Sequence, residues 1–397
     1  MTAPRRIYLD NAATSWPKPD MVYRAVDNYQ RNVGAAAGRG AYAEASQAGK
    51  AVDTTRHAIA TLLGAEHARQ VIFTCNGTDS LNLAIHGVLS AVSADRPMHV
   101  VTTVVEHNSV LRPLRAWEDT GRIAVTRVPC DATGVVDAAA MRAALRPETC
   151  LIAMTHASNV TGALQPAADV GAIARQHGAL FLLDAAQSLG DVPLDVSALN
   201  VDLLAAPGHK GLLGPLGTGV LYVRPGVEER LASVRQGGTG SQSESDLQPS
   251  DLPDKYESGN LNVPGIVGLG AAVTWLAEQS IRAIHDRTHT LIATLIEGLA
   301  GIDGVTVYGP RADQPRVGLV SIQLEGYDAQ EVAATLDAAF GVQVRAGLHC
   351  APRMHQALGT LVTGGTVRFS LGPFSTQADV DAAVDAVREI SAARLTV

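Results

Sequence analysis

The feature that most constrains this chain's fold is an alternation of short apolar runs with longer stretches of helical composition. The runs are rich in Val, Ile, Leu and Phe, and Ala- and Leu-rich segments such as 79–91, 109–120, 137–145 and 167–177 separate most of them. This alternation predicts an α/β fold whose mainly parallel sheet is covered by helices on both faces. The expected strands of this seven-stranded sheet are Val71–Thr74, His99–Val105, Ile123–Val128, Cys150–Thr155, Ala179–Leu183, Val201–Ala205 and Gly219–Val223.

A second block of elements follows a polar segment at 237–253, which we interpret as a functional or mobile loop. Helical composition dominates 263–300, and a mixture of strands and helices follows it. We therefore expect a large domain at 17–270 and a small α+β domain made of 1–16 and 271–397. The expected elements of the small domain are strands 305–308, 317–324, 342–345 and 366–371 and helices 328–340 and 376–393.

Two charged residues lie at the ends of neighbouring apolar runs. Asp184 directly follows the run 180–183, and Lys210 stands in the polar segment 207–211 after the next run. Ligands of α/β sheets bind outside the carboxyl ends of the strands. A lysine and an aspartate there match a site for pyridoxal phosphate (PLP), where the lysine forms a Schiff base and the carboxylate keeps the ring nitrogen protonated. The pair by itself would also fit an ordinary salt bridge at the sheet edge.

Further polar residues follow other expected strands. Gly77 and Thr78 open an amphipathic stretch, so their backbone N–H groups and a hydroxyl suit a phosphate, although the segment also reads as an ordinary helix cap. His107 follows the next strand and fits either a ring-stacking, proton-carrying histidine or a plain loop residue. Asn159 and Gln187 are placed to reach the phenolic oxygen of the cofactor. Together these strand ends favour one shared crevice.

Composition excludes several other classes of protein. The net charge of −8 argues against non-specific binding to nucleic acid or to an anionic membrane, both of which require clustered Lys and Arg. The N-terminus leads into a short mixed run, so we expect neither a signal peptide nor a membrane span. The four cysteines are far apart without a Cys-x-x-Cys pair, which predicts no disulfide framework, no metal site and a cytoplasmic location.

Several motifs occur in a fixed order along the whole chain. They are Tyr8-Leu9-Asp10-Asn11-Ala12-Ala13-Thr14, Glu106-His107-Asn108, Ser158-Asn159-Val160-Thr161-Gly162, Asp184-Ala185-Ala186-Gln187, Gly208-His209-Lys210 and Arg345-Ala346-Gly347-Leu348-His349-Cys350-Ala351-Pro352. In this order they resemble the cysteine desulfurases of the class V aminotransferase superfamily. The short segment around Cys350 is similar to that of the second desulfurase group, which includes selenocysteine-lyase-like members. The resemblance implies the type I fold of PLP-dependent transferases.

The resemblance also implies a role for each matching position. Lys210 would be the catalytic Schiff-base lysine, Asp184 the partner of the ring nitrogen, and His107 the catalytic histidine that stacks on the ring. Arg368 would clamp the substrate carboxylate, for which a planar guanidinium is suited, and Asn11 is assigned to the substrate with it. The remaining implied cofactor-binding residues are Gly77, Thr78, Asn159, Gln187, His209 and, from across a dimer interface, Asn260.

Two positions depart from the family pattern. Pro207 stands where many desulfurases have a hydroxyl residue, and proline offers neither a hydroxyl nor an N–H. One phosphate contact must therefore be lost or replaced. Asn260 stands where a threonine is usual. We interpret both as features of a divergent branch that retains the cofactor.

Cys350 decides between the chemistries that such a site supports. A free cysteine is most often a small buried hydrophobe, and the apolar surroundings of Cys75, Cys130 and Cys150 fit that role. Cys350 instead lies in a loop expected between strands of the small domain, where a desulfurase uses a thiolate to take the substrate's sulfur as a persulfide. The nucleophile must be the thiolate, which a nearby cation favours, and His349 is the closest candidate in sequence.

We therefore expect a PLP-dependent cysteine desulfurase that converts L-cysteine to L-alanine. Selenocysteine lyase activity, or another class V lyase or aminotransferase activity, is the alternative, and a non-catalytic PLP-binding regulatory protein is a second one. The resemblance further implies a homodimer and a possible sulfur-acceptor protein as partners.

Overall fold

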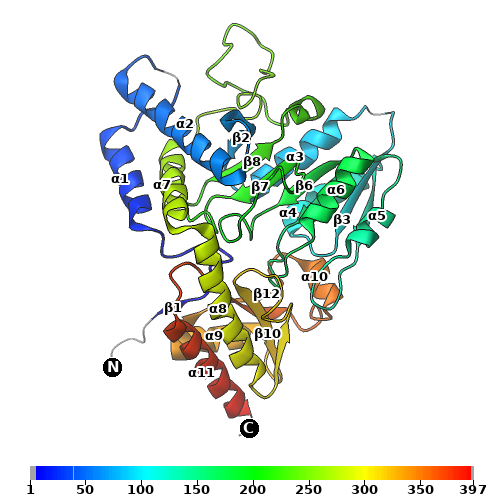
Figure 1. Cartoon of the computed structure of the whole chain (residues 1–397), viewed down its shortest axis with the longest axis vertical. Helices are drawn as coiled ribbons and strands as arrows, with labels where there is room; N and C mark the ends of the chain where they lie inside the picture. The colour runs from blue at the N-terminus through cyan, green and yellow to red at the C-terminus, as the bar shows by residue number, and fades with distance from the viewer. Residues whose placement is uncertain (1–5, 39, 94, 395–397) are drawn as a thin grey trace.

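The computed structural model of the chain describes residues 6–38, 40–93 and 95–394. Two lobes are visible in Figure 1, a larger one built on a wide sheet and a smaller one that holds the first and the last of the described residues. The larger sheet and the smaller sheet have separate hydrophobic cores. Within the described residues, no helix combines the length and the apolar character needed to cross a membrane.

The larger sheet confirms the predicted α/β fold. Its strands run in parallel except for β8, which is antiparallel to both of its neighbours. Most of its strands are buried along their whole length, which explains why their sequences read as continuous apolar runs. In spatial order, the strands of this seven-stranded part of the described chain are β2 (Val71–Thr74), β8 (Gly219–Val223), β7 (Leu203–Pro207), β6 (Leu180–Asp184), β5 (Thr149–Thr155), β3 (Met98–Thr103) and β4 (Ile123–Val128).

Helices cover both faces of the larger sheet. One face packs against α3 (Gly77–Ala91) and α4 (Asn108–Asp119). The helices of the other face are α2 (Ala43–Leu63), α5 (Ala138–Ala143), α6 (Ala167–His177) and α7 (Val263–Gln279), with α1 (Asp20–Asn32) against α7. The sequence pattern predicted no element between residues 20 and 63. The reason is that the buried face of α2 includes three alanines, Thr55 and Arg56 beside only a few large apolar residues, so its apolar periodicity is weak.

The smaller lobe contains an antiparallel sheet packed against helices. Its strands lie in the order β12 (Arg345–Gly347), β13 (Thr366–Ser370), β10 (Leu319–Leu324) and β9 (Val305–Tyr308). The helices that pack on it are α8 (Ile281–Ala300), α9 (Ala329–Phe340) and α11 (Gln377–Arg394), and β1 (Ile7–Tyr8) pairs in parallel with β11 (Val342–Gln343). Short 3₁₀ turns at Ala68–Gln70 and Val227–Arg230 complete the larger lobe.

The smaller lobe differs from the predicted pattern around residues 342–357. The single strand expected at 342–345 is divided into β11 and β12, which belong to different sheets. A short helix, α10 (Pro352–Ala357), occupies the expected loop after Cys350. It begins with Pro352 in its first turn, a position that favours helix initiation. The cysteine segment is therefore a strand–turn–helix connection.

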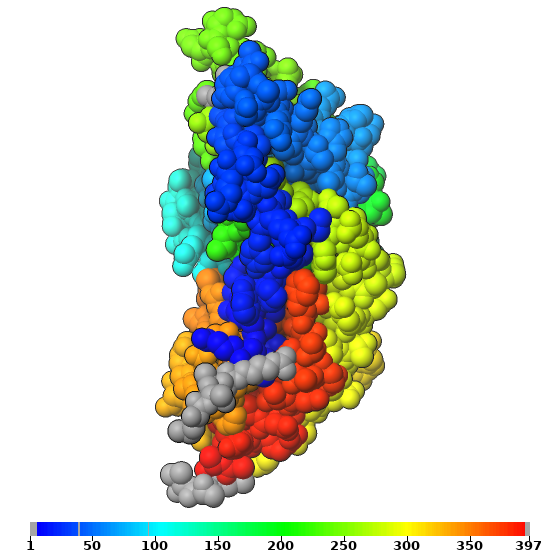
Figure 2. Space-filling model, turned by 90° about the vertical axis from the view of Figure 1, so that its left-hand side faces the viewer, coloured from blue at the N-terminus to red at the C-terminus, as the bar shows by residue number. Residues whose placement is uncertain are grey.

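The two lobes meet along the N-terminal segment and α8. Ile7 N–H donates to Gly341 O (2.9 Å) in the smaller lobe, and Ser15 N–H donates to His209 O (3.0 Å) in the larger one. Figure 2 shows this segment lying along one face of the molecule across the junction of the lobes. α7 packs in the core of the larger lobe as far as Leu276, and α8 enters the core of the smaller lobe from Leu291. The domain boundary at 270 and 271 stays a prediction.

The polar segment 237–253 contains no helix or strand, and most of its residues are exposed. It projects from the larger lobe at the top of Figure 1. The chain that follows it is fixed by a buried ion pair. Arg56 of α2 donates to both carboxylate oxygens of Glu257, at 2.7 and 2.9 Å, and Phe73 N–H donates to the same carboxylate at 2.6 Å.

Candidate active site

A cavity of about 470 Å³ opens at the carboxyl ends of the strands of the larger sheet. Several elements that are far apart in sequence contribute to its lining, as the strand-end argument predicts. Of the predicted cofactor-binding residues, those that line it are Gly77, Thr78, His107, Asn159, Asp184, Gln187, His209 and Lys210. Asn260 follows the polar segment 237–253, is exposed, and is not part of this lining.

Asp184 is the last residue of β6 and is 3% exposed. Ala186 N–H donates to its Oδ1 at 2.9 Å. Burial raises the pKa of the carboxyl, while this hydrogen bond and the charge of Lys210 oppose the increase. A buried carboxylate in a cavity wall is stabilised by a cation placed against it. The protonated ring nitrogen of PLP is such a cation, so Asp184 fits this role.

Lys210 follows β7 and faces the same cavity. Burial lowers the pKa of its amine to about 8, and the charge of Arg368 lowers it further while Asp184 opposes the decrease. A lysine with a lowered pKa has an appreciable neutral fraction near neutral pH. The neutral amine is the form that attacks an aldehyde or accepts a proton, so Lys210 suits both tasks.

The N-terminus of α3 forms another wall of the cavity. Gly77 and Thr78 are the first residues of this helix, and unsatisfied N–H groups at a helix N-terminus favour a phosphate. Thr78 Oγ1 shares a hydrogen bond with Ser109 Oγ at 2.8 Å. The ring of Pro207 packs on Gly77, where an added Cβ would lie 3.0 Å from Pro207 Cδ. Pro207 therefore closes the wall of the cavity, in place of the hydroxyl that the family pattern has there.

His107 caps the N-terminus of α4. Ser109 N–H donates to its Nδ1 at 3.0 Å, so Nδ1 is the acceptor and the ring proton lies on Nε2. Burial lowers the pKa of the imidazole to about 4, and the charge of Lys210 contributes. The ring is therefore neutral at physiological pH, which fits stacking on an aromatic cofactor.

The two predicted phenolate contacts both hold neighbouring backbone. Asn159 Nδ2 donates to His349 O at 2.6 Å, and Gln187 Nε2 donates to Ala12 O at 3.0 Å. Both residues also line the cavity. His209 lies nearby, with its Nδ1 in a hydrogen bond to Thr14 Oγ1 at 3.1 Å.

Arg368 lies in the middle of β13 and is 1% exposed. Its Nη2 pairs with Asp10 Oδ1 at 3.0 Å and its Nη1 donates to Asn159 O at 3.0 Å, whereas its buried Nε has no hydrogen-bond partner among the described residues. Asn11 Nδ2 donates to Ser370 O at 3.1 Å, and Asn11 lines a smaller cavity of about 50 Å³ that Lys210 also borders. These contacts do not test the substrate roles of Arg368 and Asn11, which stay predictions.

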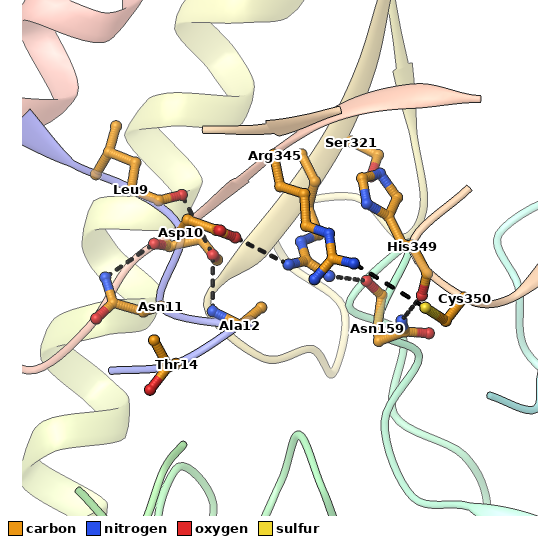
Figure 3. A network of polar contacts seen from close by, with 12 residues as sticks. Leu9, Asp10, Asn11, Ala12, Thr14, Asn159, Ser321, Arg345, His349 and Cys350 are labelled. Atoms are coloured by element: carbon orange, nitrogen blue, oxygen red, sulfur yellow. Dashed lines mark hydrogen bonds and ion pairs between the residues drawn. The ribbon is translucent and has the colours of Figure 1, made fainter. Parts of the chain in front are cut away.

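Cys350 follows β12 in a turn whose backbone is left-handed, with φ of 47° at His349 and 59° at Cys350. Arg345 lies opposite Arg368 in the register of β12 and β13, and its Nη2 is 4.0 Å from Cys350 Sγ. Figure 3 shows Arg345 reaching toward the sulfur while the His349 ring points away. The cation beside the thiol is thus Arg345, in place of the predicted His349.

His349 is unsuited to be that cation for a physical reason. Its ring is buried, and Nε2 shares a hydrogen bond with Thr366 Oγ1 at 3.1 Å. Burial and the nearby charge of Arg368 lower its pKa to about 2, so the imidazole is neutral. Among the other cysteines, Cys75 is exposed, contrary to the buried position expected for it.

Sequence reasoning assigned no role to Arg345 or to Asp10, although both lie within the quoted motifs. The register that sets Arg345 opposite Arg368 depends on the pairing of two short strands, which sequence alone does not reveal. Glu106 was also left without a role. It is fully buried behind the site, and Thr103 Oγ1 donates to its Oε1 at 2.6 Å. Its place directly after an apolar run expected to be a buried strand was the signal in the sequence that could have identified Glu106.

The site has a lysine and a buried aspartate at the strand ends of a mainly parallel sheet, and a second lobe lies beside it. This is the arrangement of PLP-dependent transferases of type I. The family model described as "Aminotransferase class-V" matches residues 7–383. The chain therefore belongs to the class V aminotransferase family, a family of PLP-dependent enzymes, and the predicted relationship and fold are confirmed.

Curated relatives and solved structures are similar over nearly the whole chain. A "Probable cysteine desulfurase" of Methanothermobacter thermautotrophicus is 35% identical over 387 residues, covering 97% of this chain and 94% of that protein. "Cysteine desulfurase IscS" of Anaeromyxobacter dehalogenans is 34% identical, with 95% and 90% covered. The apo structure of a cysteine desulfurase from Thermococcus onnurineus is 31% identical, with a TM-score of 0.91 and coverage of 98% and 95%.

Proposed function

We propose that this chain is a PLP-dependent cysteine desulfurase that converts L-cysteine to L-alanine and takes the sulfur onto Cys350 as a persulfide. The observation that carries the proposal is the position of Cys350. Its thiol lies 4.0 Å from the guanidinium of Arg345, on the strand paired with that of Arg368. The names of the relatives support the same activity.

The residues of the larger cavity fit PLP. Asp184 would bind the ring nitrogen, His107 the ring face, and the N-terminus of α3 with Thr78 and His209 the phosphate. Lys210 would hold the cofactor covalently. When bound, PLP supplies an electron sink that stabilises negative charge on the substrate Cα.

Substrate binding is assigned to Arg368 and Lys210. A guanidinium binds a carboxylate through two parallel N–H donors, and the buried Nε of Arg368 is a donor without a partner among the described residues. The amine of Lys210, with its pKa lowered to about 8, is the base for the Cα proton. Neutral His107 is the proposed carrier that returns a proton to the substrate.

In the sulfur-transfer step, one sulfur atom passes from the carbon of the substrate to the thiol of Cys350. The thiolate of Cys350 attacks the substrate sulfur, so an S–S bond forms as the C–S bond breaks. The substrate carbon keeps the bonding electron pair and takes a proton, which gives alanine. The guanidinium of Arg345, 4.0 Å from the sulfur, places a positive charge beside the attacking group. A thiol of an acceptor protein or a small molecule then takes the outer sulfur and regenerates Cys350.

We also propose a homodimer and a cytoplasmic location. Asn260 is exposed outside the cavity of its own chain, which suits a contact with the site of a second copy. The proposed chemistry requires a free thiol, and all four cysteines are free in the structure. A reducing cytoplasm keeps such thiols available.

The activity is tested by incubating the purified protein with PLP and L-cysteine, L-selenocysteine or L-alanine in separate reactions. We expect alanine and a persulfide from L-cysteine. Alanine from L-selenocysteine with none from L-cysteine would replace the proposal with selenocysteine lyase activity. Absence of turnover with a normal cofactor spectrum would contradict both.

The cofactor assignment is tested separately with Lys210→Ala. The wild-type protein should be yellow, and borohydride should attach the cofactor permanently to Lys210. The variant should lose this attachment and all turnover, while Asp184 and the phosphate contacts still allow reversible PLP binding. A colourless wild-type protein that does not bind added PLP would overturn the assignment.

A further inference from the structure

The turn that carries Cys350 has a backbone that needs external support. Three residues of the turn have a positive φ: Gly347 at 107°, His349 at 47° and Cys350 at 59°. The last two are consecutive and are not glycines. Left-handed backbone is unfavourable for residues with a Cβ, and it persists only where the surroundings fix it. The contacts that hold the turn therefore determine where the sulfur points.

Two hydrogen bonds from the larger lobe hold successive carbonyls of this turn. Asn159 Nδ2 donates to His349 O at 2.6 Å, and Asn108 N–H donates to Cys350 O at 2.7 Å. Figure 3 shows the Asn159 amide directed at the carbonyl beside Cys350. The Asn108 contact uses a backbone group that most residues would supply. The Asn159 contact depends on the side chain, so it is specific to this residue.

Asn159 also connects the turn with the rest of the site. Its own carbonyl accepts from Arg368 Nη1 at 3.0 Å. The residue is 9% exposed and lines the larger cavity together with Lys210. One buried residue thus contacts the proposed carboxylate clamp, the proposed cofactor cavity and the cysteine turn.

We propose that Asn159 is a positioning residue for Cys350, beyond any contact that it makes with the cofactor. This inference rests on the proposed function and extends it to the geometry of the sulfur step. The amide fixes the carbonyl of His349, which keeps the strained turn in one conformation. The Cys350 thiol is thereby held in place for attack.

The proposal is tested on the full-length protein, with and without PLP, through the mobility of the turn. Asn159→Asp keeps the shape of the side chain and removes the N–H donor, and Asn159→Ala removes the whole amide. In both variants, amide hydrogen exchange in a peptide that covers residues 347–351 should become about three- to tenfold faster, the change expected from losing one hydrogen bond. Alkylation of Cys350 by iodoacetamide should accelerate in parallel.

The matched control is Gln187→Ala. Gln187 lines the same cavity, but its amide donates to Ala12 O, away from the cysteine turn. Exchange at 347–351 should therefore match that of the wild type. If both Asn159 variants fold, bind PLP more weakly and leave exchange and alkylation unchanged, Asn159 is a cofactor ligand only and the proposal is overturned.

A separate result distinguishes this inference from the proposed activity. If the wild-type protein makes no alanine from L-cysteine while the Asn159 variants still loosen the turn, the positioning role stands and the desulfurase activity fails. The Asp variant keeps the side-chain volume, so it remains informative if the Ala variant does not fold.

Discussion

At the scale of single residues, the site buries two acids at strand ends of the larger sheet, Asp184 at the end of β6 and Glu106 just after β3. Burial raises the pKa of Glu106 to about 8, and the nearby Asp184 charge adds to the increase while the hydrogen bond from Thr103 opposes it. Its Oε2 has no hydrogen-bond partner in the part of the chain that the structure describes. Glu106 is therefore protonated at neutral pH and places no second negative charge behind Asp184.

Glu106 makes the stability of the protein depend on pH in a defined direction. The folded chain holds its proton up to about pH 8, whereas the unfolded chain releases it near the ordinary pKa of 4.5. The stabilisation is complete below pH 4.5 and is lost as the pH rises toward 8, by about 1.4 kcal/mol per pH unit.

Glu106→Gln should remove that contribution. Urea denaturation at several pH values between 5 and 8 should show a flatter pH dependence of the unfolding free energy in the variant than in the wild type. Thr103→Val, which removes the hydroxyl donor and keeps the acid, is the control and should retain the slope. Equal slopes in Glu106→Gln and the wild type would mean that Glu106 is ionised when buried.

At the scale of elements, the buried pair of Arg56 and Glu257 attaches the end of the polar segment to α2 and to β2. The side chains are 7% and 5% exposed and make two hydrogen bonds with each other. Removing one partner of a buried pair leaves the other charge without compensation, which costs about 3–5 kcal/mol. An exposed pair such as Asp20 and Arg24 contributes much less.

Glu257→Gln should therefore lower the free energy of unfolding by about 3–5 kcal/mol. Asp20→Asn, the matched control in an exposed pair, should lower it by less than about 1 kcal/mol. Both values can be measured by urea denaturation at neutral pH. A Glu257→Gln protein as stable as the Asp20→Asn protein would show that the pair does not anchor the segment.

Elements with continuous apolar runs were predictable from sequence, and those that depend on tertiary contacts were not. The buried strand β6 and its terminal Asp184 could be read directly, because burial on both faces requires an unbroken apolar run. Helix α2 was not predicted, since the alanines, Thr55 and Arg56 on its buried face weaken the contrast between its apolar and polar positions. The role of Arg345 was also inaccessible, because it arises from the pairing of β12 with β13.

At the scale of the whole molecule, the site combines groups from both lobes. Lys210 and Asp184 belong to the larger lobe, while Arg368 and Cys350 belong to the smaller one. Neither Asn260 nor the projecting segment 237–253 contributes to the lining of the cavity of its own chain. If a second copy uses them to complete its site, the active form is a homodimer with two-fold related sites.

Subunit mixing tests this arrangement. Lys210→Ala subunits and Asn260→Ala subunits should each show little activity alone. Hybrids formed by mixing should recover up to about a quarter of the wild-type rate per subunit, because half of the subunits are in hybrid dimers and one of the two sites in each is intact. Size-exclusion chromatography should show a dimer. Full activity of a monomer would contradict the arrangement.

The measurement that tests the central claim most directly is the mass of the Cys350 peptide after brief exposure of the PLP-loaded protein to L-cysteine. The wild-type peptide should gain the mass of one sulfur atom. Cys350→Ala should lose alanine formation by about a hundredfold or more, as expected when a nucleophile is removed, while L-cysteine still changes its absorption spectrum. Cys75→Ala, which removes an exposed thiol, should behave like the wild type. Full desulfurase turnover by Cys350→Ala would contradict the account.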